Sequence, residues 1–298
     1  MTQQPKSVII IGKGPAGISA ALYTARAKID TTVIANGLGS LEKAEKIENF
    51  YGLEAPISGP ELVARGVEQA KKLGVKFVDD EVLSIDNSSS LMTVVGKNGS
   101  YEASAILIAT GASRPAPRIE GLRDLEGKGV SYCAVCDAFF YRGKDVAVLG
   151  NGEFALHEAK ELLPVVGSVT VLTNGDEAKA DFPPEVKVIT SKIKQLHGGP
   201  FNPLFGTSGP LERVEFENEE ELNVSGLFVA YGTAGSVALA MKLGILTQDN
   251  SIVVDKEMRT NINGVFAAGD CTGGLLQIAK ATGDGAIAAK SMIKYLRD

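Results

Sequence analysis

The stretch Ser7-Val8-Ile9-Ile10-Ile11-Gly12-Lys13-Gly14-Pro15-Ala16-Gly17, near the start of the chain, decides the fold. Its first half is a short β-branched apolar run, which is typical of a strand buried in a parallel sheet. Its second half is a G-x-G-x-x-G turn that opens an Ala-rich helical pattern from about Pro15 to Ala27. In such a turn the first glycine permits the bend, the second lets a pyrophosphate approach, and the third allows close helix packing. The stretch therefore predicts a dinucleotide-binding unit, with the helix N-terminus facing the phosphates.

The same arrangement returns in the second half of the chain. Residues 144–149 form an apolar strand pattern, and a G-x-G-x-x-A turn follows at Gly150, Gly152 and Ala155. A helix over 153–163 and a strand over 168–172 are expected next. Because 298 residues suffice for two domains of ordinary size, the repeat predicts an α/β chain with two Rossmann-like nucleotide-binding domains.

Other segments fill in this plan. Residues 105–111 and 227–232 are buried strand patterns that close the two halves, and residues 76–84 are expected to form one strand. Residues 264–270 form an apolar strand that delivers Asp270 to the sheet edge where α/β folds bind ligands. The small-residue stretches 113–117 and 231–237 are predicted to connect the domains.

The segment Ser131-Tyr132-Cys133-Ala134-Val135-Cys136-Asp137 carries a C-x-x-C pair followed by an acid. On the motif alone it fits half of a zinc site, a pair of inert structural thiols or a redox-active disulfide. Zinc needs at least two further ligands, and the chain offers only Cys271, His157 and His197. We therefore predict no metal, and the nucleotide-binding units on either side favour the redox pair.

Composition excludes several classes of partner and location. A net charge of −6 and a pI of about 5.2 argue against nucleic acid. The apolar runs are strand-sized, so no membrane span is expected. The first seven residues are polar and show no secretory signal, which predicts a reducing compartment, the cytoplasm.

Taken in order, the motifs resemble those of the low-molecular-weight thioredoxin reductase family over nearly the whole chain. They are G-K-G-P-A-G, E-N-F, A-T-G, S-Y-C-A-V-C-D, G-N-G-E-F-A and G-V-F-A-A-G-D-C. The resemblance implies a three-layer ββα fold in each domain. It also implies an FAD-binding domain of residues 1–114 and 238–298, split around an inserted disulfide and NAD(P)H-type domain of residues 115–237.

The resemblance further implies FAD as cofactor, a thioredoxin-like protein as partner and a homodimer. Cys136 would lie beside the flavin, Cys133 would attack the partner disulfide, and Asp137 would be the general acid–base. A terminal helix over 286–297, opened by Gly283-Asp284-Gly285, would point its N-terminus at the flavin. The residues expected to hold FAD are Gly12, Gly14, Pro15, Ala16, Gly17, Asn49, Thr110, Gly111, Gly269, Asp270, Gln277 and Ile278.

The chain departs from the family where the family holds the 2′-phosphate of NADPH. The family's His-Arg-Arg run and its further Arg are replaced by Thr173-Asn174-Gly175, followed by Asp176, Glu177 and Asp181. No arginine lies between Arg142 and Arg213. Leu276 replaces an arginine, and residues 233–236 replace an H-S-P-N run. Each missing Arg–phosphate contact removes roughly 1.5–3 kcal/mol of binding.

The sequence thus predicts an FAD-dependent disulfide oxidoreductase for which NADPH is not the efficient donor. Ferredoxin is the favoured donor, and NADH or weakly bound NADPH is the next alternative. A second flavin at Gly150, Gly152 and Ala155 is a third alternative, and a non-catalytic FAD-binding scaffold is a fourth.

Overall fold

The structure is a computed structural model that describes residues 6–112, 117–200, 209–231 and 236–298. The chain divides into two units, Met1–Ser113 with Gly235–Asp298, and Arg114–Ala234. The first unit is thus assembled from both ends of the chain, around the second. The predicted connections at 113–117 and 231–237 lie partly outside the described residues.

The first unit is built on a five-stranded parallel sheet in the order β18-β7-β1-β2-β3. Its β-branched strands β1 and β7 are buried on both faces, as the apolar patterns predict. The strands are β1 (Ser7–Ile11), β2 (Asp30–Ala35), β3 (Lys76–Asp79), β7 (Ala105–Ile108) and β18 (Val265–Ala267).

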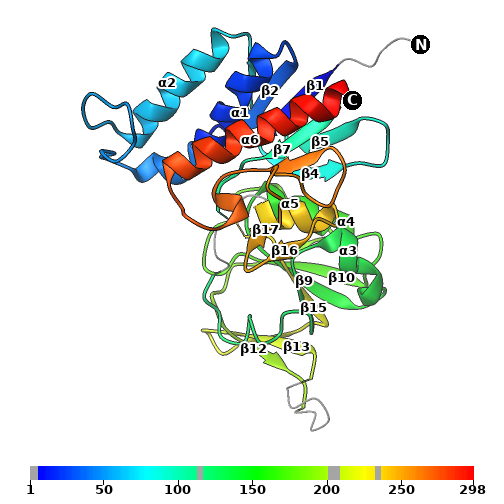
Figure 1. The fold of residues 1–298 in the computed structure, drawn as a ribbon. Coiled ribbons are helices and arrows are strands. Elements are labelled where there is room, and N and C mark those ends of the chain that lie inside the picture. Colours follow the sequence, from blue (N-terminus) through cyan, green and yellow to red (C-terminus); the bar gives the residue numbers. More distant parts are fainter. Residues whose placement is uncertain (1–5, 113–116, 201–208, 232–235) are drawn as a thin grey trace. The chain divides into compact units, whose positions relative to one another are not determined.

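Two helices from opposite ends of the chain lie side by side on this sheet, α1 (Pro15–Arg26) and α6 (Ile278–Arg297) (Figure 1). The prediction that the last helix opens at Gly283-Asp284-Gly285 is wrong, because α6 begins before this segment, at Ile278. Gly285 lies within the helix, where a Cβ atom would strike the backbone oxygen of Ala16. Gly285 therefore serves close helix packing, and its high cost within a helix is offset by that contact.

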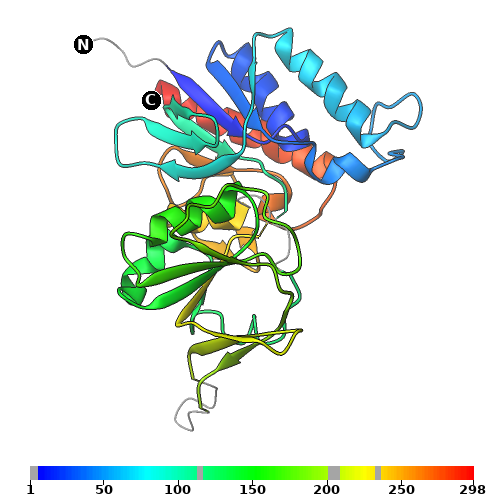
Figure 2. The same cartoon turned by 180° about the vertical axis from the view of Figure 1, so that it is seen from behind.

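Smaller elements complete the first unit, with an antiparallel sheet of β4 (Val82–Asp86), β5 (Met92–Gly96) and β6 (Ser100–Ala103) (Figure 2). The single strand predicted over 76–84 is in fact two strands in two sheets. Buried Asp80 separates them, because its carboxylate accepts the N–H groups of Glu81 and Asn98 and the Tyr101 hydroxyl. The others are η1 (Gly39–Lys43), α2 (Gly59–Lys71), α5 (Ser236–Lys242), β16 (Thr247–Gln248), β17 (Ser251–Ile252) and η3 (Asp270–Thr272).

The second unit repeats the plan with a parallel sheet in the order β11-β10-β9-β15-β8. Its helix α4 (Glu153–Leu162) follows the second glycine turn, and α3 (Ala134–Asp137) and η2 (Ala138–Tyr141) hold the C-x-x-C segment. The strands of this sheet are β8 (Val130–Ser131), β9 (Asp145–Leu149), β10 (Ser168–Leu172), β11 (Lys187–Ile189) and β15 (Gly226–Val229).

A second, antiparallel sheet of the same unit consists of β12 (Ile193–Gly198), β13 (Leu211–Phe216) and β14 (Glu221–Asn223). Leu149, Leu172 and Leu227 of the parallel sheet share one apolar core with Leu196 and Val214 of the antiparallel one. The predicted α/β class with two Rossmann-like units is confirmed. Within the described residues, no helix has the length and apolarity that a bilayer span requires.

Candidate cofactor and disulfide sites

The first glycine turn follows β1 with the geometry its residues predict. Gly12 has φ 114°, and a Cβ atom there would strike the backbone of Ala109 at the end of β7. Gly17 packs against the Gly12 oxygen, which brings α1 onto the turn. A Cβ atom on Gly14, by contrast, would meet no described atom within 4 Å. The turn therefore leaves open space at the residue through which a pyrophosphate is expected to approach.

The carboxyl end of β18 lies against this turn. Gly269, with φ 87°, approaches so closely that its Cβ atom would be 2.9 Å from the Ala16 Cβ. Half-buried Asp270 follows, and burial, supported by the charge of Asp284, raises the pKa of its carboxyl group, while Lys280 lowers it. The neighbouring Thr110 hydroxyl is buried and has no hydrogen-bond partner within the described residues. A buried hydroxyl of this kind is what a bound ligand would satisfy.

Asn49 and Gln277, which are 228 residues apart, meet at this edge through a hydrogen bond of 3.1 Å from Asn49 Nδ2 to Gln277 Oε1. Gln277 is the N-cap of α6, so Ile278 is the first helical residue. Gly111, with φ 79°, follows Thr110. The predicted FAD residues thus converge on one edge of one sheet. The open space at Gly14 and the unsatisfied Thr110 hydroxyl fit FAD.

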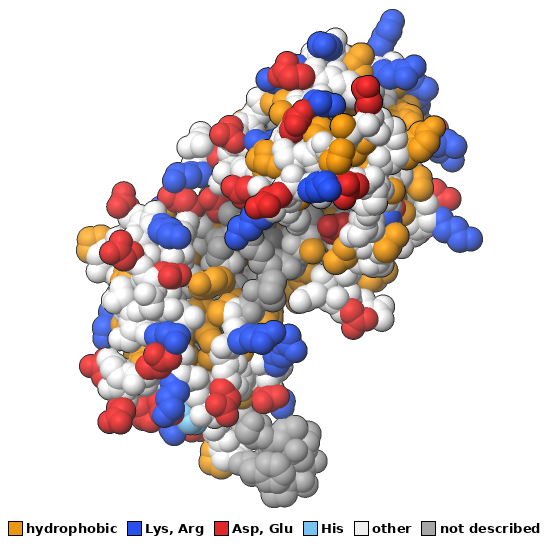
Figure 3. All heavy atoms as spheres, turned by 90° about the vertical axis from the view of Figure 1, so that its left-hand side faces the viewer, with side chains coloured by type: hydrophobic (Ala, Val, Ile, Leu, Met, Phe, Trp, Pro, Cys, Tyr) orange, Lys and Arg blue, Asp and Glu red, His pale blue; other side chains and the backbone are white. Residues whose placement is uncertain are grey.

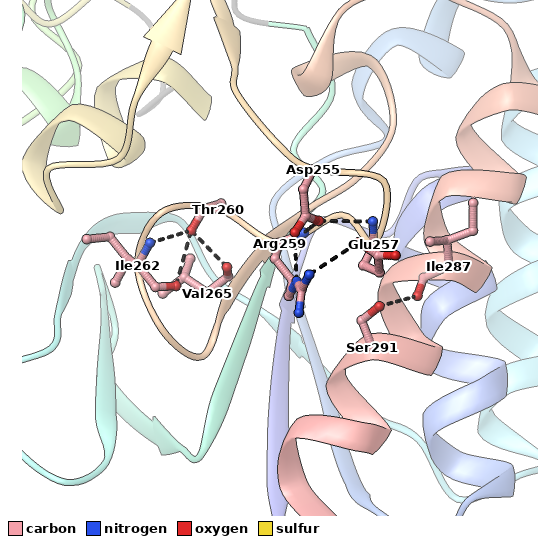
Figure 4. A network of polar contacts seen from close by, with 8 residues as sticks. All are labelled: Asp255, Glu257, Arg259, Thr260, Ile262, Val265, Ile287 and Ser291. Atoms are coloured by element: carbon pink, nitrogen blue, oxygen red, sulfur yellow. Dashed lines mark hydrogen bonds and ion pairs between the residues drawn. The ribbon is translucent and has the colours of Figure 1, made fainter. Parts of the chain in front are cut away.

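The loop before β18 is held by its own polar side chains (Figure 4). Arg259 Nε donates to Asp255 Oδ2 over 2.7 Å, and the other Asp255 oxygen accepts the Arg259 N–H. Thr260 Oγ1 donates to the Val265 oxygen over 2.8 Å. These bonds fix the entry of the strand that carries Asp270.

Sequence reasoning missed two residues of this site, Lys280 and Asp284. Both belong to α6, and both contact the Gly269 peptide through hydrogen bonds. The available signal was a lysine at the helix start, where a cation opposes the helix dipole.

In the second unit, Cys133 and Cys136 form a disulfide, while Cys271 of the first unit is free and buried. Cys133 is buried and N-caps α3, because its Sγ accepts the Cys136 N–H over 3.2 Å. Cys136 is exposed.

Ser131 links Cys133 to Asp137, a role that sequence reasoning missed. Its Oγ donates to Asp137 Oδ2 over 2.7 Å and accepts the Cys133 N–H over 3.1 Å. Buried Glu158 of α4 adds a second anchor, because its Oε2 accepts the Ala134 N–H over 2.9 Å. The acid and the thiol are therefore held together by the strand end and by α4.

Three exposed apolar side chains lie close to the disulfide in sequence. Val135, Phe139 and Phe140 are each 60–70% exposed. The two phenylalanine rings meet edge to face, with centroids 6.4 Å apart, and the Arg142 guanidinium lies 5.3 Å from the Phe139 centroid. We call these four residues the aromatic patch. Exposed aromatic groups beside a reactive pair are typical of a protein-binding surface.

The second glycine turn resembles the first, with φ 157° at Gly150 against 114° at Gly12. The polar groups near the second turn are bonded to other parts of the chain. Asn174 Oδ1 accepts the Ile193 N–H, and Thr173 Oγ1 donates to the Asp176 oxygen. Asn174 and Gly175 have φ 55° and 93°, a left-handed conformation that asparagine and glycine tolerate and arginine disfavours. The conformation of the turn after β10 therefore depends on the residues present, and arginine would fit poorly at Asn174 or Gly175.

Three hydrogen bonds lie at the carboxyl edge of the sheet near this turn. Asn151 donates to the Glu177 oxygen and accepts the Lys179 N–H. The Tyr231 hydroxyl donates to Asp176 Oδ2 over 3.1 Å, and burial, followed by this bond, raises the pKa of Tyr231. Because β9 lies between β10 and β15, the contact from Asp176 to Tyr231 passes over Gly150–Gly152. We call these contacts the strap.

Metal ligation finds no support in the described parts of the chain, which hold no cluster of three potential ligands.

Burial raises the pKa of the Cys271 thiol to about 12, so this cysteine is a poor nucleophile at neutral pH. On the face drawn in Figure 3, acidic and basic side chains alternate and form no patch of one sign.

Comparison with known proteins covers nearly the full chain. Residues 6–285 match the family of pyridine nucleotide-disulphide oxidoreductases. The chain is 34% identical to thioredoxin reductase of Listeria innocua, with 98% of this chain and 94% of that protein covered. It is 41% identical to the crystal structure of the atypical thioredoxin reductase TRi from Desulfovibrio vulgaris Hildenborough, with 98% of each chain covered and a TM-score of 0.89. A ferredoxin-flavin thioredoxin reductase from Clostridium acetobutylicum is 29% identical, with 98% of each chain covered and a TM-score of 0.71.

Proposed function

We propose that this chain, which belongs to the pyridine nucleotide-disulphide oxidoreductases and within them to the low-molecular-weight thioredoxin reductases, reduces the disulfide of a thioredoxin-like protein. It is a flavoprotein disulfide reductase, and its cofactor is FAD. When bound, FAD accepts electrons from the donor and supplies an electron pair to the disulfide. The same proposal includes a homodimer in the cytoplasm.

The thiol chemistry is proposed to use Cys133, Cys136 and Asp137. The electron pair breaks the Cys133–Cys136 bond and leaves two sulfur anions, one of which takes a proton from Asp137. The Cys133 thiolate attacks one sulfur of the partner disulfide, and a mixed disulfide forms as the partner's other sulfur leaves and is protonated. Cys136 then attacks Cys133, which restores the internal disulfide and releases the reduced partner.

The aromatic patch supports a protein as the substrate. Phe139 and Phe140 keep most of their surface exposed beside the disulfide, and this exposure costs stability in the free protein. A thioredoxin-like partner would cover them, and Cys133, which is buried in this structure, would have to become exposed to meet the partner disulfide.

For the donor, we propose reduced ferredoxin and not NADPH. The observation that carries this proposal is the turn after β10, where Thr173 and Asn174 bond within the chain and Asp176 faces Tyr231. A 2′-phosphate carries close to two negative charges, and it would meet carboxylates and no nearby arginine. The 29% identical relative named for ferredoxin offers a precedent. NADH or weak NADPH use, and a second flavin on the second turn, remain the alternatives.

The test of the donor is anaerobic mixing of the FAD-loaded protein with NADPH, NADH and reduced ferredoxin in parallel. We expect rapid flavin bleaching with ferredoxin alone, followed by reoxidation when a thioredoxin is added. Saturable bleaching by micromolar NADPH at rates that support turnover would refute the donor proposal.

Two further measurements test the rest. Cys136→Ser should trap thioredoxin as a mixed disulfide through Cys133, and Cys133→Ser should not; the reverse pattern would exchange their roles. A dithionite titration should consume electrons for both the flavin and the disulfide. Consumption by the flavin alone would indicate a non-catalytic scaffold.

A further inference from the structure

Lys280 and Asp284 are two largely buried charges that the proposed reaction does not use. Lys280 Nζ lies 2.8 Å from Asp284 Oδ2, and the two side chains are only 22% and 10% exposed. Lys280 also occupies the first turn of α6, where the helix dipole disfavours a cation. Burying a cation at such a position costs free energy, so its contacts must offset that cost.

The contacts of the pair converge on the turn that carries Asp270. Lys280 Nζ donates to the backbone oxygens of Gly269 over 2.9 Å and Gly273 over 2.7 Å. It also lies 2.8 Å from Thr272 Oγ1, which accepts from it. Asp284 Oδ2 accepts the Gly269 N–H over 3.2 Å. The ion pair thereby holds both polar groups of Gly269.

The held peptide sets the position of two parts of the FAD site. Gly269 immediately precedes Asp270, so its orientation fixes the direction of that carboxylate. It also approaches Ala16 of the first glycine turn, with only 2.9 Å from a Cβ built on Gly269 to the Ala16 Cβ. A shift of Gly269 would therefore move Asp270 and press on the pyrophosphate-binding turn together.

We propose that Lys280 and Asp284 are paired positioning residues of the FAD site, which hold Gly269 and Asp270 and act on the bound flavin with opposite charges. Both charges also act on Asp270: burial raises the pKa of its carboxyl group, and on top of this Lys280 lowers that pKa and Asp284 raises it. The proposal concerns the cofactor site and goes beyond the proposed donor and partner.

The first experiment measures FAD affinity by titrating the apoprotein of Lys280→Met, Asp284→Asn and the double variant. We expect Lys280→Met to weaken FAD binding about tenfold to a hundredfold, because it leaves a buried carboxylate unpaired. Asp284→Asn should weaken it less, because Lys280 keeps three oxygen acceptors. The double variant should bind more tightly than Lys280→Met. Lys290→Met is the matched control, since Lys290 is an exposed lysine of the same helix.

The second experiment measures the flavin reduction potential by dye-equilibrated titration, which needs no donor protein. Lys280→Met should lower the potential, because the electron-rich reduced flavin loses a nearby cation. Asp284→Asn should raise it. A merely structural role would not shift the two in opposite directions, so shifts of the same sign, or none, would overturn the proposal. The proposal would also be overturned if the losses of FAD affinity in the two single variants simply added up in the double variant.

If Lys280→Met does not fold, Asp284→Asn still decides, since a lowered or unchanged potential in it contradicts the proposal. Both readouts are independent of the donor. Flavin reduction by NADPH would refute the proposed donor and leave this inference intact.

Discussion

The two glycine turns have similar backbones and differ in the residues that lie near them. Gly12 packs against Ala109 and Gly150 against Ala230, each at the end of the neighbouring strand. Above the first turn, Gly14 faces open space and Thr110 keeps an unsatisfied hydroxyl. Above the second, the strap joins Asp176 to Tyr231. The glycines thus determine the shape of the turn. We infer that the residues at the ends of the neighbouring strands determine whether a ligand can bind there.

Gly14→Glu should give the largest effect on this comparison. The backbone of Gly14 is extended and its Cβ direction is free, so the apoprotein should fold. The new carboxylate would occupy the pyrophosphate space, and FAD binding should weaken at least about a hundredfold. Titration of apoprotein with FAD measures the effect.

The matched control is Gly152→Glu, at the corresponding place in the second turn. It should leave FAD content unchanged if the two turns have separate uses. Equal loss of FAD in Gly14→Glu and Gly152→Glu would contradict the conclusion that the two turns have separate uses.

Ser131→Ala tests the thiol chemistry that we propose for the second unit. It removes the hydroxyl that joins Asp137 to the Cys133 N–H, so the acid loses its orientation and thioredoxin reduction should slow about tenfold. Ser131→Thr keeps a hydroxyl, and its β-branch suits strand β8, so it should restore most of the rate.

Ser168→Ala is the control, since Ser168 makes a similar bond to Asp145 at the surface of the same unit. Stopped-flow reoxidation of the reduced protein by thioredoxin measures all three variants. A normal rate in Ser131→Ala would remove Ser131 from the site.

Local patterns predicted both glycine turns and most of the parallel strands, because each depends on neighbours in sequence, whereas the C-x-x-C motif alone left the role of its thiols open. The start of α6 was missed, since Gly283 and Gly285 suggest a helix boundary and only the packing of Gly285 on Ala16 explains a glycine inside the helix. The lysine and aspartate pair was missed for a related reason. Its purpose depends on Gly269, which lies eleven residues before Lys280 and meets it only in the folded turn.

Tyr231→Ala tests whether the strap hinders nucleotide binding at the second turn. It removes the side chain that reaches Asp176 over Gly150–Gly152, and affinity for ADP-ribose should rise roughly threefold to tenfold. Isothermal titration against the unaltered protein measures this change, and Tyr231→Phe should give part of it. Tyr101→Phe in the first unit is the control. Unchanged affinity in Tyr231→Ala would show that the strap does not close the turn.

The smallest expected effect is a pH-dependent change in the free energy of unfolding that is due to Cys271 of the first unit and not to the disulfide of the second. Burial raises the pKa of Cys271 from 9.0 to about 12, so the unfolded chain loses this proton at a lower pH than the folded chain. The folded state then binds more protons than the unfolded state above about pH 9, and stability falls as pH rises.

Between about pH 8 and about pH 10, Cys271 should therefore reduce the free energy of unfolding by about 1 kcal/mol. The oxidised Cys133–Cys136 pair has no thiol to titrate, so among the 3 cysteines the effect belongs to Cys271. Urea unfolding of the oxidised protein and of Cys271→Ala at both pH values isolates it, because other titrating groups cancel in the difference. If both proteins lose the same stability, the Cys271 thiol titrates alike in the folded and unfolded chain, and its burial does not make it inert.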